Sequence, residues 1–143
     1  MLFDIMTDSA CDLTPEVAKK LNIKVVPFYV SLDGEHYQKE GEEISVRSFY
    51  QFMVDNPLAY PKTSLPSIED FEQMFRKQAE AQRPTLCLCF TGRMSGCVGS
   101  ARNARELVLE DYPDAQIEVM DTAAATVTEA ITVENAVAIR DAG

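Results

Sequence analysis

Short apolar runs alternate with amphipathic stretches along the whole of this chain. The runs have the length of β-strands and are too short for buried helices. They cover residues 2–6, 23–32, 85–90 and 116–120. The run at 85–90 is continuously apolar, which is typical of a central parallel strand covered on both faces. After the run at 23–32, Asp33-Gly34 predicts a hairpin turn, with His36-Tyr37 on the returning strand.

Helices are predicted between these runs from capping residues and from apolar positions three and four residues apart. Thr14 before Pro15 is an N-terminal capping signal, and Ser67 with Asp70 resembles a capping box. The five predicted helices begin after Thr14, after Ser45 and after Ser67, and span residues 95–111 and 127–142. Alternating strands and helices predict an α/β fold, a mostly parallel sheet with helices on both faces.

The composition favours one globular domain over residues 1–143, with 46% hydrophobic and 25% charged residues. A net charge of −10 argues against a nucleic-acid ligand and against docking on anionic membranes. No apolar run approaches the ~20 residues of a membrane span, and no signal peptide is expected. The four cysteines show no metal-finger spacing, so we expect reduced thiols in a cytoplasmic protein; they are Cys11, Cys87, Cys89 and Cys97.

Polar residues follow three of the predicted strands. Asp8-Ser9 follows the first, Ser95 follows the central one, and Thr122 follows the last. Because the carboxyl ends of parallel strands meet at one edge of a sheet, we expect these residues at a common ligand-binding edge. The loop Thr63-Ser64 precedes a helix and is expected to fold over the same edge.

Two of these segments offer free donors for an anion. Ser95-Gly96-Cys97 and Thr63-Ser64 each place hydroxyls and backbone N–H groups at a predicted helix start. The positive end of the helix dipole adds to their attraction for a carboxylate or phosphate. Arg93 is close enough in sequence to attract the same anion.

Other interpretations of these residues stay open at this point. Thr63 and Ser64 also suit a simple turn, and Ser95 suits a helix cap. An acyl or ester hydrolase using Ser95 lacks a nucleophile-elbow motif, and His36 is the only histidine. A homo-oligomeric interaction module is a further alternative function. Aspartates after strands usually stabilise loops, so we predict no metal and no catalytic residue.

Several motifs occur in an order that resembles the DegV family of bacterial fatty-acid-binding proteins. They are Thr7-Asp8-Ser9 with Asp12-Leu13, Val26-Pro27, Asp33-Gly34 with Tyr37, Pro61 to Ser67, Ser95-Gly96 with Ser100-Ala101, and Asp121-Thr122. The match covers essentially the whole chain. The resemblance implies the N-terminal domain of a two-domain lipid carrier, with the C-terminal domain absent, that holds a long-chain fatty acid and is not an enzyme.

The resemblance also implies roles for individual residues. Thr63 and Ser95 would contact the fatty-acid carboxylate, and we expect backbone N–H donation at Gly96 and Cys97. Supporting residues are expected around them: Ser64, Asp8, Ser9, Arg93 and Thr122. The implied partners are the fatty acid and a fatty acid kinase, with no cofactor beyond the ligand. A homodimer is a further expected association.

The chain departs from the family pattern at three places. Cys97 stands where the family usually has Thr, and a thiol is a weak donor. Thr122 stands where the family has Ser, which keeps the hydroxyl. The chain ends at Gly143, where family members continue into a second domain. Because each buried CH₂ contributes ~0.8 kcal/mol, we expect an open half-site to bind weakly.

Overall fold

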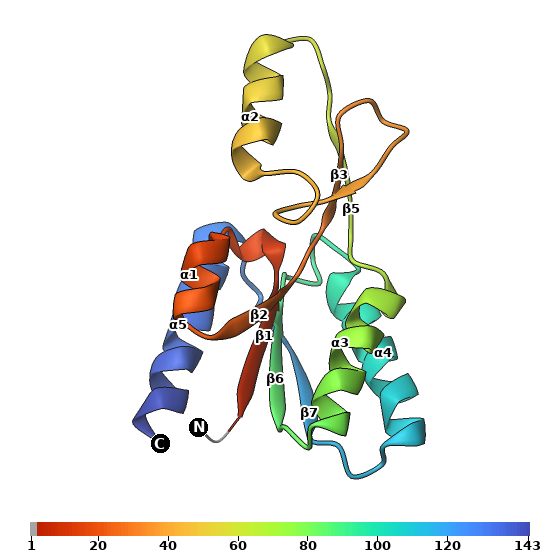
Figure 1. Cartoon of the computed structure of the whole chain (residues 1–143), viewed down its shortest axis with the longest axis vertical. Helices are drawn as coiled ribbons and strands as arrows, with labels where there is room; N and C mark the ends of the chain where they lie inside the picture. Colours follow the sequence, from red (N-terminus) through yellow and green to blue (C-terminus); the bar gives the residue numbers. More distant parts are fainter. Residues whose placement is uncertain (1–2) are drawn as a thin grey trace.

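The computed structural model describes residues 3–143, and a four-stranded parallel sheet with helices on both faces dominates it (Figure 1). This arrangement confirms the predicted α/β class. The strand order is β2 (Ile23–Val26), β1 (Asp4–Asp8), β6 (Thr85–Cys89) and β7 (Ile117–Asp121). The first strand was predicted to begin at Leu2, which lies outside the described residues, and it continues to Asp8 rather than ending at Met6.

Two hydrophobic clusters cover the two faces of this sheet. α3 (Ile68–Glu80) and α4 (Cys97–Asp111) pack on one face, and α1 (Pro15–Lys20) and α5 (Thr126–Ala142) cover the other (Figure 1). Successive side chains of β1 belong to opposite clusters. Met6 packs on the α3–α4 side and Ile5 on the α5 side. This is the period of two expected for a strand buried on both faces.

A small antiparallel sheet stands beyond the carboxyl edge of the main sheet (Figure 1). Its order is β4 (Gln38–Lys39), β3 (Tyr29–Ser31) and β5 (Lys62–Ser64), and α2 (Val46–Asp55) accompanies it. The predicted single strand at 23–32 is therefore wrong. It divides at Pro27, which has no N–H for a ladder, and the chain then passes into the second sheet.

The hairpin prediction needs a similar correction. His36 and Tyr37 lie in the turn rather than on the returning strand, which begins at Gln38. The carboxylate of Asp33 accepts the backbone N–H of His36 at 2.8 Å and also pairs with its ring Nδ1 at 2.6 Å. These bonds hold His36 in the turn, and only Gln38 and Lys39 are left to pair with β3.

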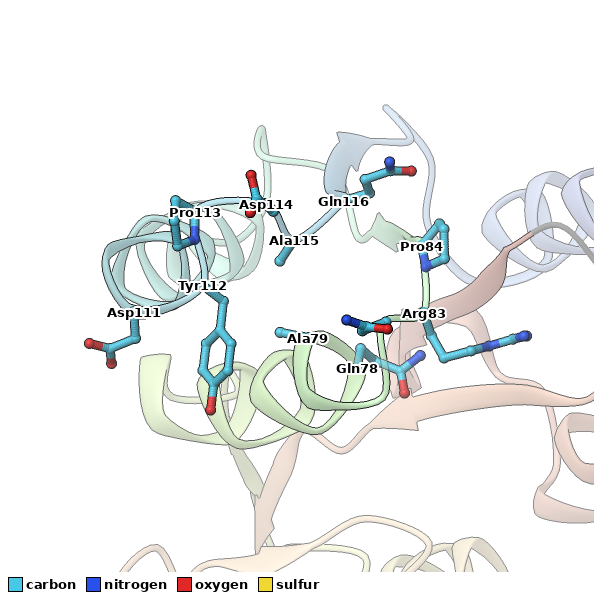
Figure 2. A pocket seen from close by; sticks show the side chains of 11 residues that line it. Gln78, Ala79, Arg83, Pro84, Asp111, Tyr112, Pro113, Asp114, Ala115 and Gln116 are labelled. Atoms are coloured by element: carbon cyan, nitrogen blue, oxygen red, sulfur yellow. The ribbon is translucent and has the colours of Figure 1, made fainter.

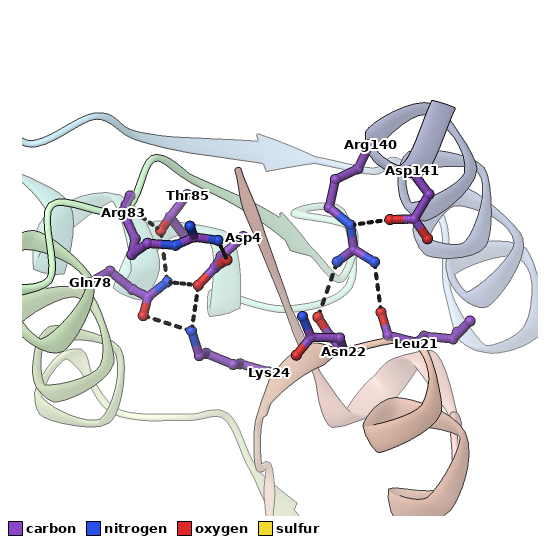
Figure 3. Close-up of polar contacts among 9 residues, drawn as sticks. All are labelled: Asp4, Leu21, Asn22, Lys24, Gln78, Arg83, Thr85, Arg140 and Asp141. Carbon is purple, nitrogen blue, oxygen red and sulfur yellow. Dashed lines mark hydrogen bonds and ion pairs between the residues drawn. The ribbon is translucent and has the colours of Figure 1, made fainter. Parts of the chain in front are cut away.

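Polar contacts tie the ends of the elements together (Figure 3). Asp4 accepts bonds from Lys24 at 2.7 Å and from Arg83, and Gln78 donates to it at 2.7 Å. These partners explain how an aspartate begins an otherwise apolar strand. None of the helices in residues 3–143 is long and apolar enough to span a lipid bilayer.

Candidate functional site

The segments predicted to share a ligand lie around the carboxyl edge of the parallel sheet. β1, β6 and β7 end there, and they continue into the 3₁₀ turn η1 (Ser9–Cys11) and into the loops 90–96 and 122–125. The chain leaves β5 and reaches the start of α3 beside the same edge (Figure 1). The topology therefore places the predicted loops on one side of the sheet.

The turn before α4 holds donors for an external acceptor. α4 begins at Cys97 rather than at the predicted Ser95. The Ser95 N–H donates to the carbonyl of Thr91 at 3.3 Å within the preceding turn. The Ser95 Oγ accepts the Cys97 N–H at 3.1 Å, which leaves its hydroxyl proton to donate elsewhere. At this turn and the first turn of α4, three backbone N–H groups have no acceptor within residues 3–143. They belong to Gly96, Val98 and Gly99. A carboxylate would satisfy several of them at once.

Thr63 and Ser64 lie on β5, an edge strand, and not in a loop as predicted. Thr63 pairs with Val30 of β3, and both hydroxyl residues are exposed. Within residues 3–143 neither hydroxyl makes a hydrogen bond. A Cβ added at Gly96 would meet the Leu65 side chain at 3.5 Å, so the end of β5 and the turn before α4 are neighbours.

Cys97 turns its side chain away from the donors of this turn and into the core. Its thiol is fully buried and donates to the Asp8 carboxylate at 3.3 Å. Asp8 also accepts the N–H of Phe90 at 2.7 Å and of Ala10 at 3.0 Å. Burial raises the pKa of Asp8 to about 6. Asp8 therefore connects β1, β6 and α4 beneath the turn.

Ser9 and Thr122 use their hydroxyls within the chain. The Ser9 hydroxyl donates to Glu40 at 2.6 Å and accepts the N–H of Phe28 at 2.9 Å. The Thr122 hydroxyl donates to the carbonyl of Cys89 at 2.8 Å. Both residues fix the backbone of the edge, and these bonds already occupy their hydroxyl protons.

Arg93 and Gly92 form the exposed part of the loop after β6. The Arg93 guanidinium is exposed and makes no hydrogen bond or ion pair within residues 3–143. The Gly92 N–H donates to the Asp121 carboxylate at 3.1 Å, and a Cβ at Gly92 would come within 2.9 Å of that group. The absence of a side chain at Gly92 thus permits the loop to close on β7.

Ser95 has no catalytic base attached to it. Across residues 3–143, its hydroxyl has no hydrogen bond to a histidine or a carboxylate, and His36 is paired with Asp33 in the β3–β4 turn. A serine hydrolase needs a base within hydrogen-bond reach of its nucleophile. Within the described residues, Ser95 therefore lacks the hydrogen-bonded base of an activated nucleophile.

Sequence reasoning missed Glu129, a fully buried carboxyl group on α5. Its Oε1 accepts the Thr7 hydroxyl at 3.3 Å, whereas Oε2 has no partner in the described part of the chain. Burial first, and then the neighbouring Asp8, raise the pKa of Glu129 to about 9. The spacing to Val133 and Val137, at steps of four, was the available signal, since both face the core.

A cavity of about 440 Å³ lies at the opposite edge of the sheet (Figure 2). It opens between the ends of α3 and α4 and the starts of β6 and β7, and its lining includes Ala79, Pro84, Tyr112, Ala115 and Gln116. None of the predicted site residues lines it. The candidate anion site at the carboxyl edge is thus separate from this cavity.

The comparisons with known proteins agree on one family. A sequence model described as "Uncharacterised protein, DegV family" matches residues 2–143. A DegV domain-containing protein of Streptococcus pyogenes serotype M1 is 38% identical over 143 residues, which are 100% of this chain and 50% of that protein. The chain spans about half the length of the curated relatives it matches.

Solved structures show the same fold. A structure described as a fat acid (stearic acid)-binding protein from Eubacterium ventriosum is 45% identical, with a TM-score of 0.95 over 99% of this chain and 48% of its own. A DegV family protein from Thermus thermophilus, described by its fatty acid binding, is 33% identical. Its TM-score is 0.79 over 100% of this chain and 49% of its own.

Proposed function

This chain belongs to the DegV family, and we propose that it binds the carboxylate of a long-chain fatty acid between Thr63 and Ser95. The observation that carries the proposal is the turn before α4. Its Ser95 hydroxyl and unpaired backbone amides lie beside the end of β5, since a Cβ at Gly96 would lie 3.5 Å from the Leu65 side chain. Relatives at 45% and 33% identity are described as fatty-acid-binding proteins.

Each group has a separate role in this proposal. Thr63 and Ser95 donate their hydroxyl protons to the carboxylate, and Gly96 donates its N–H. Cys97 acts through its backbone, because its N–H donates to the Ser95 oxygen and leaves the hydroxyl proton available for the carboxylate. The first turn of α4 adds the positive end of its dipole. Arg93 attracts the anion from its exposed position.

The remaining predicted residues support the site from behind. Asp8, Ser9 and Thr122 hold the backbone of the edge through the hydrogen bonds described above. Ser64 is exposed next to Thr63 on β5 and forms the rim of the site in this proposal.

Apolar side chains near the turn provide a surface for the start of the alkyl chain. Phe28 and Phe90 meet edge to face at 6.0 Å between ring centroids, and both are half-buried, as is Leu65. Met94 is 73% exposed immediately before Ser95. Burial of each CH₂ contributes ~0.8 kcal/mol, so the length of chain that these residues cover sets the affinity.

The whole protein's role is a wider part of the same proposal. We infer a non-enzymatic carrier that works in the cytoplasm, where its four free thiols stay reduced. The family resemblance suggests that such a carrier presents its fatty acid to a fatty acid kinase. We also infer that residues 1–143 correspond to the N-terminal domain of the longer relatives, whose remaining half would enclose the alkyl chain.

Calorimetric titration with a long-chain fatty acid tests the site. Thr63→Ala and Ser95→Ala should each weaken binding by ~1.5–3 kcal/mol, because each removes a hydrogen bond to a charged group. Thr132→Ala removes a hydroxyl of α5 that donates to the Thr128 carbonyl within the helix, and it is the matched control. Unchanged affinity in the Thr63→Ala, Ser95→Ala double variant would refute the assignment.

A second measurement separates a carrier from a hydrolase. Native mass spectrometry of the purified chain should show a fatty acid that is recovered intact after organic extraction. Turnover of an acyl ester that disappears in Ser95→Ala would instead support the hydrolase, since a carrier needs Ser95 only for binding.

A further inference from the structure

Three of the four cysteines gather with Asp8 beneath the first turn of α4. Cys87 and Cys89 come from β6, Cys97 begins α4, and Asp8 ends β1. All four side chains are fully buried. The donor atoms of Asp8, Cys89 and Cys97 all lie within 4.8 Å of one another, and the Cys87 sulfur is 3.7 Å from that of Cys89.

We propose that Asp8, Cys89 and Cys97 bind one thiophilic divalent cation of the zinc class. Two thiolate sulfurs with a carboxylate oxygen form a ligand set that suits Zn²⁺ and its larger analogue Cd²⁺. Hard cations such as Mg²⁺ and Ca²⁺ prefer oxygen ligands alone and are disfavoured here. The proposal revises the sequence-based expectation of no metal, which rested on the usual loop-stabilising role of aspartates after strands and on cysteines without metal-finger spacing.

The sulfur–oxygen distance between Cys97 and Asp8 is close to that of a tetrahedral site. With zinc–sulfur bonds of ~2.3 Å, two sulfurs around one ion lie ~3.8 Å apart, and a sulfur and an oxygen lie ~3.5 Å apart. The Cys97 sulfur is 3.3 Å from the Asp8 oxygen, which is already in this range. The three donor atoms, all within 4.8 Å of one another, would have to close in by no more than about 1 Å to surround an ion.

The fold holds these ligands in place. Asp8 and Cys89 end adjacent parallel strands, and the backbone N–H of Phe90 and of Ala10 donate to the Asp8 carboxylate and fix its orientation. Bonds of this kind to a ligating carboxylate are typical of established metal centres. The nearby N-terminus of α4 favours the net negative charge of two thiolates and a carboxylate around a divalent ion.

A thiol is also a poor choice if the only task of Cys97 is to donate to Asp8. A hydroxyl at the same position is the stronger donor. On binding, two metal–sulfur bonds would replace the S–H bonds of Cys89 and Cys97, and both protons would pass to solvent. The ion would hold the first turn of α4 to the ends of β1 and β6.

Cadmium titration of the reduced, chelator-stripped chain tests this site. We expect one Cd²⁺ per chain, a thiolate-to-cadmium charge-transfer band in the ultraviolet, and a native mass that shows one ion in place of the displaced protons. Cys97→Thr keeps a donor to Asp8 but removes a ligand, so it should weaken binding by more than about tenfold. Cys11→Ser is the matched control, since Cys11 is buried but lies outside the group.

The outcomes separate the proposal from its alternatives. Circular dichroism verifies that each variant is folded, and Asp8→Asn replaces Cys97→Thr if the latter is not. Equal cadmium affinity of wild type and Cys97→Thr, absence of the charge-transfer band, or an equal loss in Cys11→Ser would each overturn the site. The measurement needs no fatty acid, so its result is independent of the proposed function.

Discussion

The buried carboxyl of Glu129 predicts an unusual dependence of stability on pH. Glu129 is fully buried, and its pKa is raised to about 9 by burial and by the facing Asp8. Cys11, Cys87 and Cys89 are the other titratable groups that interact with it. Within residues 3–143 no cation pairs with it, and its Oε2 has no hydrogen-bond partner. At neutral pH the folded protein therefore keeps Glu129 protonated, whereas the unfolded chain ionises it.

The sign follows from this difference in bound protons. An acid whose pKa is raised on folding leaves stability intact below its unfolded pKa and reduces it as the pH rises toward the folded pKa. For Glu129 that window runs from 4.5 to about 9. At ~1.4 kcal/mol per pH unit, keeping Glu129 protonated at pH 7 lowers the free energy of unfolding by on the order of 3 kcal/mol. Glu129→Gln removes this cost and keeps an oxygen that accepts the Thr7 hydroxyl. Its buried amide N–H lacks an acceptor, which destabilises the variant by ~1 kcal/mol.

Urea unfolding of the chelator-treated protein at pH 5 and pH 8 tests the reasoning. Glu129→Gln should be more stable than wild type by ~2 kcal/mol at pH 7 and by ~4 kcal/mol at pH 8, and should lose that advantage at pH 5. Glu134→Gln makes the same change at an exposed position of α5. It should change the free energy of unfolding by no more than ~0.5 kcal/mol at either pH. Parallel pH profiles of wild type and Glu129→Gln would show that the buried carboxyl is not protonated.

Three further substitutions test the contacts that shape the fold. Gly92→Ala forces a Cβ against the Asp121 carboxylate and should destabilise the chain by ~1–3 kcal/mol in thermal unfolding. An unchanged stability would show that the loop can shift without cost. Asp4→Asn loses its bonds from two cations and should cost about 2 kcal/mol at pH 7 in urea. Because those partners, Arg83 among them, lower the pKa of Asp4, the cost should shrink as the pH falls below 4, and a constant difference would contradict it. Ser67→Ala removes the cap of α3 and should lower the free energy of unfolding in urea by ~1 kcal/mol. Unchanged stability would show that the cap does not stabilise the helix.

The sequence by itself determined the class of fold and most of its elements. The continuous apolar run at 85–90 became β6, and the capping box of Ser67 with Asp70 formed as predicted at the start of α3. Signals of this kind are local, because a cap and a hydrophobic period involve residues within a few positions of one another. They also placed Asp8, Ser95 and Thr122 at one edge, since parallel strands share their direction.

Only the tertiary structure decided which way the side chains at this edge face and what they meet. Lys62–Ser64 became a strand because β3, about thirty residues earlier in the chain, offers it a partner. The sequence assigned a role only to the backbone N–H of Cys97, whereas its thiol meets Asp8, 89 positions away, in the core. Glu129 meets Thr7 across 122 positions. Contacts of this length depend on how helices pack on the sheet, so periodicity and capping along the chain do not specify them.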